Sequence, residues 1–256
     1  MLFLGNSHTA RNDVPGTVAA LVESAEPGLD VEAVLGPGSL HLDEREGDEA
    51  SLASVSGRSW DFVVLQAQNY SLSGTYDFPT DGAEELIRLA RQGGAEPVLF
   101  AEWARVGIDE TGIILDAYRR VTDREPACLP PVPEAFDLAL ARDPDLVLHA
   151  ADGNHSSPAG AFLASAVLAA AVSGERATSF STLTTVDVPA DVRLDSSLAR
   201  FEIDASGRVP VAHATLDLSL SMLKPIRLAG SRRFTAEVRA DSDSVAAMVE
   251  ALDRAA

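Results

Sequence analysis

Apolar and amphipathic stretches alternate along the first 175 residues of the chain. A short continuous apolar run that ends at a glycine or a polar residue is typical of a buried strand, whereas apolar positions three and four apart indicate a helix. This pattern predicts strands at residues 1–4, 29–36, 60–66 and 96–103, helices at 14–25, 81–94, 112–125, 134–143 and 157–174, and a short strand within 127–132. Asp13 is the predicted N-cap of the first helix. The alternation predicts a parallel sheet with helices on both faces.

The pattern changes near residue 175. Residues 176–240 are rich in β-branched residues that alternate with polar ones and contain Ser-Gly and Ala-Gly turn signals, which predicts two to four antiparallel strands. We therefore expect an α/β domain at 1–175, a β-rich insertion or small subdomain at 176–240, and a C-terminal helix at 241–256 that packs back on the main domain.

Polar residues follow each predicted strand of the first domain. Ser7 follows the first strand and Gly38 and Ser39 follow the second. Residues 66–70 lie at and after the end of the third, and Glu102 and Trp103 lie at the end of the fourth. Because ligands in open parallel sheets bind beyond the carboxyl ends of the strands, these residues are candidates for a ligand site.

Charge narrows the classes of partner. The 256 residues hold 39 acidic and 20 basic side chains, a formal net charge of −19. This balance argues against nucleic acid and anionic membranes as partners, and suits a neutral or cationic small molecule.

No apolar stretch approaches the roughly 20 residues of a membrane span, and the N-terminus does not resemble a signal peptide, so we expect a cytoplasmic protein. Cys128 is the single cysteine, which excludes an internal disulfide and a thiolate metal cluster.

The stretch "HAADGNHSSPAG" carries the clearest chemical signal. Asp152 and His155 lie three residues apart in a loop just before a predicted helix, where the aspartate can accept a hydrogen bond from the imidazole and fix its tautomer. A serine nucleophile needs such a base and orienting carboxylate. Ser7, in a turn between a strand and a helix, is the matching nucleophile.

A metal site is the alternative for the same loop, because His149, Asp152 and His155 are spaced three residues apart. That spacing aligns side chains only on a helix, and this stretch is a glycine-containing loop without an evident fourth ligand. We therefore predict no metal and no organic cofactor.

The blocks "FLGNSHT", "WDFVVLQAQ" and "DGNHSSPAG" together resemble the first, third and last blocks of the SGNH (GDSL-like) hydrolases, in the branch whose first block reads Gly-Asn-Ser. The resemblance covers about residues 1–175 and the last helix. It implies a three-layer α/β/α sandwich with a parallel, flavodoxin-like sheet, to which residues 176–240 add a β-rich insertion. It also implies Ser7 as nucleophile, His155 as base and Asp152 as its partner.

The resemblance further implies an oxyanion hole made by the Ser7 N–H, a glycine N–H and a side-chain amide. Gly38 is the preferred glycine and Gly36 the second choice. The family's usual Gly-x-Asn is not present in the third block, where Gln66, Gln68 and Asn69 offer amides, and we choose Gln68.

Several further residues have both a functional and a structural reading. The candidates for substrate binding are His8, Gln66, Asn69, Glu102 and Trp103, although His8 could stack on the helix start and Trp103 could be a core residue beside a solvated Glu102. Arg11 and Asn12 could touch substrate but are expected to be solvated, and His41 and His213 are expected to be surface or loop residues. Residues 41–50 are expected to form an exposed loop or helix face.

These readings predict a serine esterase, and the resemblance implies small acyl groups, with acetyl esters of carbohydrates as the example. A thioesterase or lysophospholipase with the same triad is one alternative. A catalytically silent sugar- or partner-binding module is another, with residues 176–240 as a contact surface or an oligomer interface.

Overall fold

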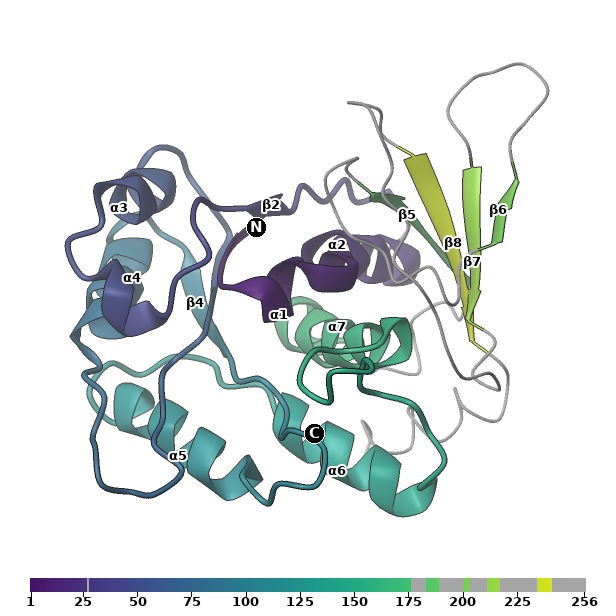
Figure 1. The fold of residues 1–256 in the computed structure, drawn as a ribbon. Helices are drawn as coiled ribbons and strands as arrows, with labels where there is room; N and C mark the ends of the chain where they lie inside the picture. The colour runs from purple at the N-terminus through teal and green to yellow at the C-terminus, as the bar shows by residue number, and fades with distance from the viewer. Residues whose placement is uncertain (27, 176–182, 189–199, 203–210, 217–233, 241–256) are drawn as a thin grey trace. The chain divides into compact units, whose positions relative to one another are not determined.

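The computed structural model describes residues 1–26, 28–175, 183–188, 200–202, 211–216 and 234–240 (Figure 1). The chain forms two compact units. The first contains Met1–Thr9 and Glu32–Glu134, and the second contains Ala10–Val31 and Ala135–Ala256. Each unit is described by itself.

A parallel sheet forms the centre of the first unit. Its strands lie in the order β2-β1-β3-β4, with bounds β1 Leu2–Leu4, β2 Val34–Leu35, β3 Phe62–Gln66 and β4 Glu96–Phe100. Every neighbouring pair is parallel. The largely apolar sequences of β1, β3 and β4 suit strands with little exposed surface. The predicted parallel sheet is therefore confirmed, and its order matches the flavodoxin-like arrangement as far as the described strands extend.

Two helices of the first unit begin and end close to the predicted residues. They are α4 Asp81–Gln92 and α5 Thr111–Thr122. The buried face of each helix joins the core between sheet and helices, to which α4 contributes Leu86 and Ile87, and α5 contributes Ile114 and Val121. The predicted strand within 127–132 is reduced to a single bridge between Val98 and Cys128.

Residues 41–50 confirm the expectation of an exposed loop or helix face only in part, since half of them are exposed but Leu42 and Arg45 are buried. They form a 3₁₀ helix, η2 Leu42–Arg45, followed by helix α3 Glu49–Ser56. Leu42 and Arg45 have no exposed surface. The burial of Arg45 could not be predicted, because it comes from polar contacts, which hydrophobic periodicity does not register.

The second unit contains helices α2 Val14–Ala25 and α7 Pro158–Ser173, preceded by the 3₁₀ helix η1 Arg11–Asp13. Asp13 caps α2 as predicted, since its side chain accepts a hydrogen bond from the Gly16 N–H at 3.3 Å. Helix α7 is buried over most of its length, as expected of a helix that is apolar on all sides. No helix in the described part of the chain combines the length and apolarity needed to cross a bilayer.

Helix α6, Val132–Arg142, lies largely in the second unit. The same unit contains a sheet in the order β5-β8-β7-β6, with bounds β5 Leu183–Val188, β6 Arg200–Glu202, β7 Val211–Leu216 and β8 Phe234–Ala240. Two pairs are antiparallel as predicted, but β7 and β8 pair in parallel, so the all-antiparallel expectation is wrong there. Turn signals locate strands without fixing which strands become neighbours. The predicted helix at 241–256 lies outside the described residues.

Candidate active site

The strand order of the first unit points to its ligand-binding edge. Strand β2 lies on one side of β1, and β3 and β4 lie on the other side. The order in which the strands are added therefore reverses between β1 and β3. Ligands bind at the carboxyl ends of the strands at such a switch point. Ser7 follows β1 there, begins the short helix α1 Ser7–Ala10 and is exposed.

The turn before Ser7 is fixed by buried partners. The Asn6 N–H and the Thr9 hydroxyl both donate to Gln66 Oε1, each at 2.9 Å. A Cβ at Gly5 would collide with the Thr9 hydroxyl, so this position requires glycine. The polar cluster after β1 is therefore a turn held against the end of β3.

His8 packs on the interior of the first unit. Its ring lies 5.4 Å from the ring of Trp103, and its Nδ1 lies 3.2 Å from Asn6 Oδ1. Trp103 is only 1% exposed and Glu102 only 9%. Both side chains lie in the core, as in the structural reading of Trp103, and their contact with substrate stays a prediction.

The two candidate oxyanion glycines differ in what their N–H groups do. The Gly36 N–H donates to the Phe3 carbonyl at 2.8 Å, which uses it in the sheet. Gly38 is exposed and has a φ of 73°, in the left-handed region that favours glycine. This difference favours Gly38, as the resemblance implied.

The amides of the third block make contacts inside the first unit. Gln68 Nε2 donates to the carbonyls of Asn69 at 3.3 Å and Pro79 at 3.1 Å, and the side chain is buried. Asn69 Nδ2 donates to Asp43 Oδ1 at 2.8 Å. Both amide hydrogens of Gln68 are used in these contacts, and its choice as oxyanion donor stays a prediction. Gln66 Oε1 accepts hydrogen bonds in the Ser7 turn, and its contact with substrate also stays a prediction.

A buried network connects the ends of β3 and β4. The Tyr118 hydroxyl donates to Glu102 Oε2 at 2.8 Å and accepts from the N–H groups of Ala67 at 3.0 Å and Gln68 at 3.2 Å. Ala67 has a φ of 84°, which is strained for a residue with a Cβ. Burial raises the pKa of Glu102, and the hydrogen bonds from Tyr118 and Gln66 oppose that effect. The sequence carried no signal for the role of Tyr118.

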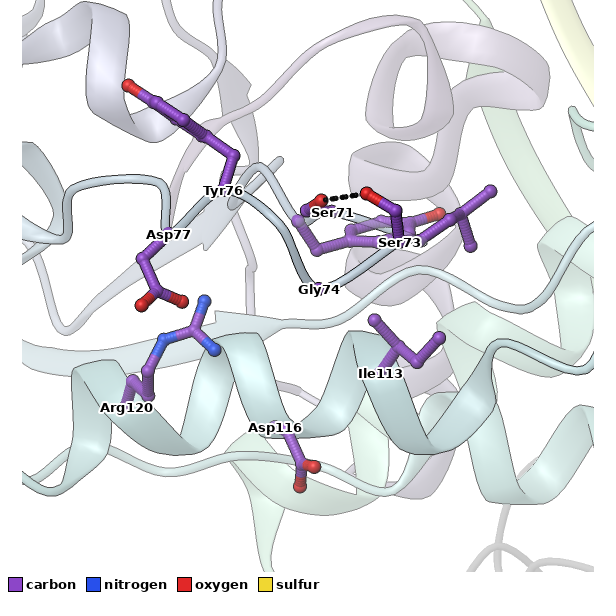
Figure 2. A pocket seen from close by; sticks show the side chains of 10 residues that line it. Ser71, Ser73, Gly74, Tyr76, Asp77, Ile113, Asp116 and Arg120 are labelled. Carbon is purple, nitrogen blue, oxygen red and sulfur yellow. Dashed lines mark hydrogen bonds between the residues drawn. The ribbon is translucent and has the colours of Figure 1, made fainter.

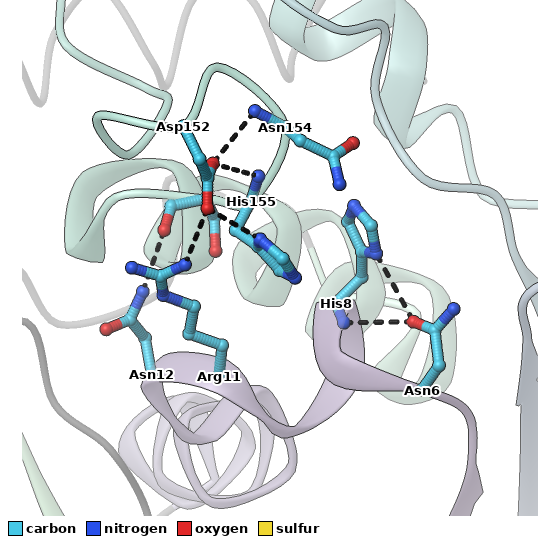
Figure 3. A network of polar contacts seen from close by, with 8 residues as sticks. Asn6, His8, Arg11, Asn12, Asp152, Asn154 and His155 are labelled. Atoms are coloured by element: carbon cyan, nitrogen blue, oxygen red, sulfur yellow. Dashed lines mark hydrogen bonds and ion pairs between the residues drawn. The ribbon is translucent and has the colours of Figure 1, made fainter. Parts of the chain in front are cut away.

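The second unit holds the predicted base and its orienting carboxylate (Figure 3). His155 Nδ1 lies 2.8 Å from Asp152 Oδ2. Asp152 Oδ1 accepts from the backbone N–H groups of Asn154 and His155, each at 2.9 Å. Partial burial opposes ionisation of Asp152, but these hydrogen bonds outweigh it and hold the pKa of Asp152 well below its usual range. An ionised carboxylate can only accept, so Nδ1 carries the proton and Nε2 of the neutral ring is the basic nitrogen.

The loop around His155 is closed by backbone contacts. The Ala150 N–H donates to the His155 carbonyl at 2.8 Å, and the Ser157 N–H donates to the Leu148 carbonyl at 2.9 Å. Ser157 also caps α7 by accepting from the Gly160 N–H at 3.1 Å. A Cβ at Gly160 would collide with the Leu148 carbonyl, so only glycine fits against the loop.

Arg11 and Asn12 contact this loop instead of being merely solvated. Arg11 Nη1 lies 3.1 Å from Asp152 Oδ2. Asn12 is buried, has a φ of 57° and donates to the Ser156 carbonyl at 3.0 Å. Asparagine tolerates left-handed backbone better than most residues, which explains its place here.

The metal alternative gains no support from the geometry. The His149 ring packs edge-on against Phe136, with ring centroids 5.9 Å apart. Within the described residues, no three His, Cys, Asp or Glu side chains lie together as a metal site.

The first unit also carries a surface pocket of about 310 Å³ between the segment after β3 and helix α5 (Figure 2). Asp77 and Arg120 point toward one another there, and the hydroxyls of Ser71 and Ser73 are hydrogen-bonded at 3.2 Å. Its lining also includes Tyr70, Tyr76 and Ile113. Pattern reasoning did not identify this pocket, because its residues come from two separate segments.

Comparison with solved structures finds similar folds. A candidate SGNH hydrolase from Slackia heliotrinireducens is 29% identical to this chain, and the match covers 66% of this chain and 96% of that one, with a TM-score of 0.51. A mutant acetyl-xylooligosaccharide esterase from Geobacillus stearothermophilus is 16% identical, with 68% and 94% coverage and a TM-score of 0.51. A candidate GDSL-like lipase from Parabacteroides merdae is 15% identical, with the same coverages and TM-score.

No family model and no curated protein matches the sequence. The parallel sheet with its flavodoxin-like order agrees with the folds of the solved structures. The described part of the chain therefore has a fold similar to that of these SGNH (GDSL-like) hydrolases.

Proposed function

We propose that the protein is a serine esterase that hydrolyses small acyl esters through a covalent acyl-enzyme. Ser7 is the nucleophile, His155 the general base and Asp152 the residue that orients the imidazole. The observation that carries this proposal is the 2.8 Å contact between His155 Nδ1 and Asp152 Oδ2. It supplies the orienter and base of a serine hydrolase in a chain of hydrolase fold.

The reaction has two halves. His155 Nε2 takes the proton of Ser7 as Oγ attacks the ester carbonyl, and then gives that proton to the departing alcohol. A water molecule attacks the acyl-serine with the same proton transfers, which releases the carboxylic acid and restores Ser7. The ionised Asp152 stabilises the imidazolium that forms in each half.

The oxyanion is stabilised by backbone donors. We assign this role to the N–H groups of Ser7 and Gly38. Each lies in a segment after a strand at the ligand-binding edge, and the Gly36 N–H is already used in the sheet. Gln68 is not assigned, since its amide donates to two backbone carbonyls.

The proposed substrate is an acetyl ester, with an acetylated carbohydrate as the natural alcohol. This choice follows the resemblance in the first and last blocks, and one solved structure of the same fold is an acetyl-xylooligosaccharide esterase. Fold alone does not fix a substrate, so the acyl donor is part of the test.

The test compares wild type, Ser7→Ala and His155→Ala on p-nitrophenyl acetate and butyrate, acetylated xylo-oligosaccharides and an acetyl thioester. Ser56→Ala is the matched control, because Ser56 lies at the exposed end of α3. We expect wild type and Ser56→Ala to turn over, and both triad variants to lose at least about 10³-fold in kcat/KM.

Labelling with a fluorophosphonate probe completes the experiment. We expect wild type to be labelled and Ser7→Ala not to be. Faster turnover of the thioester than of every ester would favour the thioesterase alternative. Equal activity of wild type and Ser7→Ala, together with no labelling, would contradict the proposal and favour a binding module.

A further inference from the structure

Arg45 carries a charge with no exposed surface. Its Nη2 donates to the carbonyls of Gly5 at 2.9 Å and Gly38 at 3.4 Å. Its Nη1 donates to the Pro37 carbonyl at 3.1 Å and to Ser51 Oγ at 2.7 Å. Among the ion pairs of the described residues, none includes Arg45. Arginine is rarely buried, and burial of a charged group is costly. A buried guanidinium that bonds mainly to backbone carbonyls therefore indicates a specific role.

The carbonyls that Arg45 contacts belong to two chain segments. Gly5 lies in the turn that leads from β1 to Ser7, and Pro37 and Gly38 lie in the segment after β2. These segments hold the two backbone N–H groups that the proposed function assigns to the oxyanion. Arg45 thus donates hydrogen bonds to carbonyls in both segments that carry the proposed oxyanion donors. It is not itself one of those donors.

Peptide geometry connects the Pro37 contact to the Gly38 N–H. The carbonyl of Pro37 and the N–H of Gly38 are parts of one trans peptide, in which the two groups point in opposite directions. Because Nη1 draws the carbonyl toward the buried guanidinium, the Gly38 N–H points away from it. A cation at the carbonyl oxygen also polarises the peptide and strengthens its N–H as a donor.

The Gly5 contact fixes the Ser7 turn in the same way. The Gly5–Asn6 peptide is held at both ends, since its carbonyl accepts from Arg45 and its N–H donates to Gln66 Oε1 at 2.9 Å. Ser7 begins one residue later. Rotation of that peptide would break both contacts.

We propose that Arg45 is a positioning residue for ester hydrolysis, which aims the Gly38 N–H at the oxyanion and fixes the turn that carries Ser7. This inference rests on the proposed function. It also explains why arginine is needed, because a lysine ammonium lacks the planar fork that reaches carbonyls in two segments at once.

The test measures kcat and KM for p-nitrophenyl acetate with Arg45→Met, Arg45→Lys and Val121→Ala. The last is a control that opens a cavity at Val121, a fully buried apolar side chain of α5. The inhibition constant of a small alkylboronic acid, which forms a tetrahedral adduct with the serine, is measured in parallel. Thermal melting and circular dichroism check folding.

We expect Arg45→Met to lower kcat by about 10- to 100-fold with KM within about threefold, and to weaken boronic acid inhibition by a similar factor. Loss of a whole oxyanion donor costs about 10²–10³-fold, and a misaimed donor costs less. Arg45→Lys should fall between wild type and Arg45→Met, and it carries the test if the methionine variant does not fold. Val121→Ala should melt earlier and keep its kcat.

An Arg45 variant that keeps wild-type kcat and boronic acid affinity, while Ser7→Ala is inactive, would overturn this inference and leave the proposed function standing. A loss of kcat in Val121→Ala equal to that in Arg45→Met would also overturn it, because destabilisation alone would then explain the effect. Wild type no faster than Ser7→Ala would overturn the proposed function and this inference with it.

Discussion

The turn before Ser7 and the loop of His155 are held in opposite ways. Gly5 is fixed by Arg45, 40 positions away along the chain. Asn6 and Thr9 are fixed by Gln66, 60 and 57 positions away. Asp152 instead receives three of its contacts from Asn154 and His155, two and three residues away, and one from the distant Arg11. The first arrangement exists only once the sheet has formed. The second depends mainly on a short stretch of sequence.

This difference predicts that substitutions in the two segments have different effects. The Ser7 turn depends on buried polar groups, and removing a partner of such a group leaves a desolvated atom unsatisfied. The His155 loop is partly exposed, so changes there should affect charge and tautomer more than stability. Three further substitutions test this distinction.

The largest effect is expected for Asp152→Asn. The amide oxygen can still accept from the backbone N–H groups of Asn154 and His155, so the loop should fold, but the charge that fixes the imidazole tautomer is lost. We expect kcat/KM for p-nitrophenyl acetate to fall by about 10²–10⁴-fold, with thermal stability little changed.

Arg11→Gln is the matched control for Asp152→Asn. It removes the other partner of Oδ2, an ion pair whose side chains are 30% and 44% exposed, and exposed pairs contribute little. A loss of activity as large as that of Asp152→Asn would show that Arg11, and not the aspartate alone, sets the state of the imidazole.

Tyr118→Phe should have its main effect on stability. The substitution deprives the N–H groups of Ala67 and Gln68 of their acceptor and Glu102 of its donor. We expect the free energy of unfolding to fall by about 1–3 kcal/mol in chemical denaturation. Tyr76→Phe, at a residue that is 59% exposed, should change it very little. Equal effects would mean that the buried network does not support the fold.

Glu102→Gln should change how stability depends on pH. The pKa of Glu102 is raised by burial, so its favourable contribution is fully present below the unfolded value of about 4.5 and is lost as the pH rises through the folded value. Across that window wild type should lose up to about 1.4 kcal/mol per pH unit from this group, whereas the glutamine variant should not.

Denaturation of wild type and Glu102→Gln at pH values from 5 to 8 would measure this difference. Parallel curves for the two proteins would contradict the assigned role of the carboxyl. The effect should be the smallest of the three, because hydrogen bonds from Tyr118 and Gln66 partly offset the burial.

Local pattern predicted most of the first 175 residues because the elements there have apolar faces of regular period. It missed η2 and α3, in which few apolar residues are buried; α3 buries only Ser51 and Val55. The beginning of α3 was nonetheless marked by Asp48, which caps this helix by accepting from the Ser51 N–H at 2.8 Å.

In the candidate site, contacts between residues close in the sequence could be predicted, and contacts between distant residues could not. Asp152 and His155 could be paired from the sequence because the loop between them is short. The roles of Arg45, Gln66 and Tyr118 could not, since each depends on a contact with a residue far away in the chain. A polar residue in an apolar strand or helix, such as Gln66 at the end of β3, is the one local sign that such a contact exists.

Gly160 has a consequence for how the evolution of this chain would be read. Space beside the Leu148 carbonyl, not chemistry, restricts this position to glycine. Selection that preserves the histidine loop would therefore preserve Gly160 as strictly as His155, although the glycine transfers no proton and binds no substrate. Invariance in an alignment of homologues would mark both residues alike, and only the reason for it would differ.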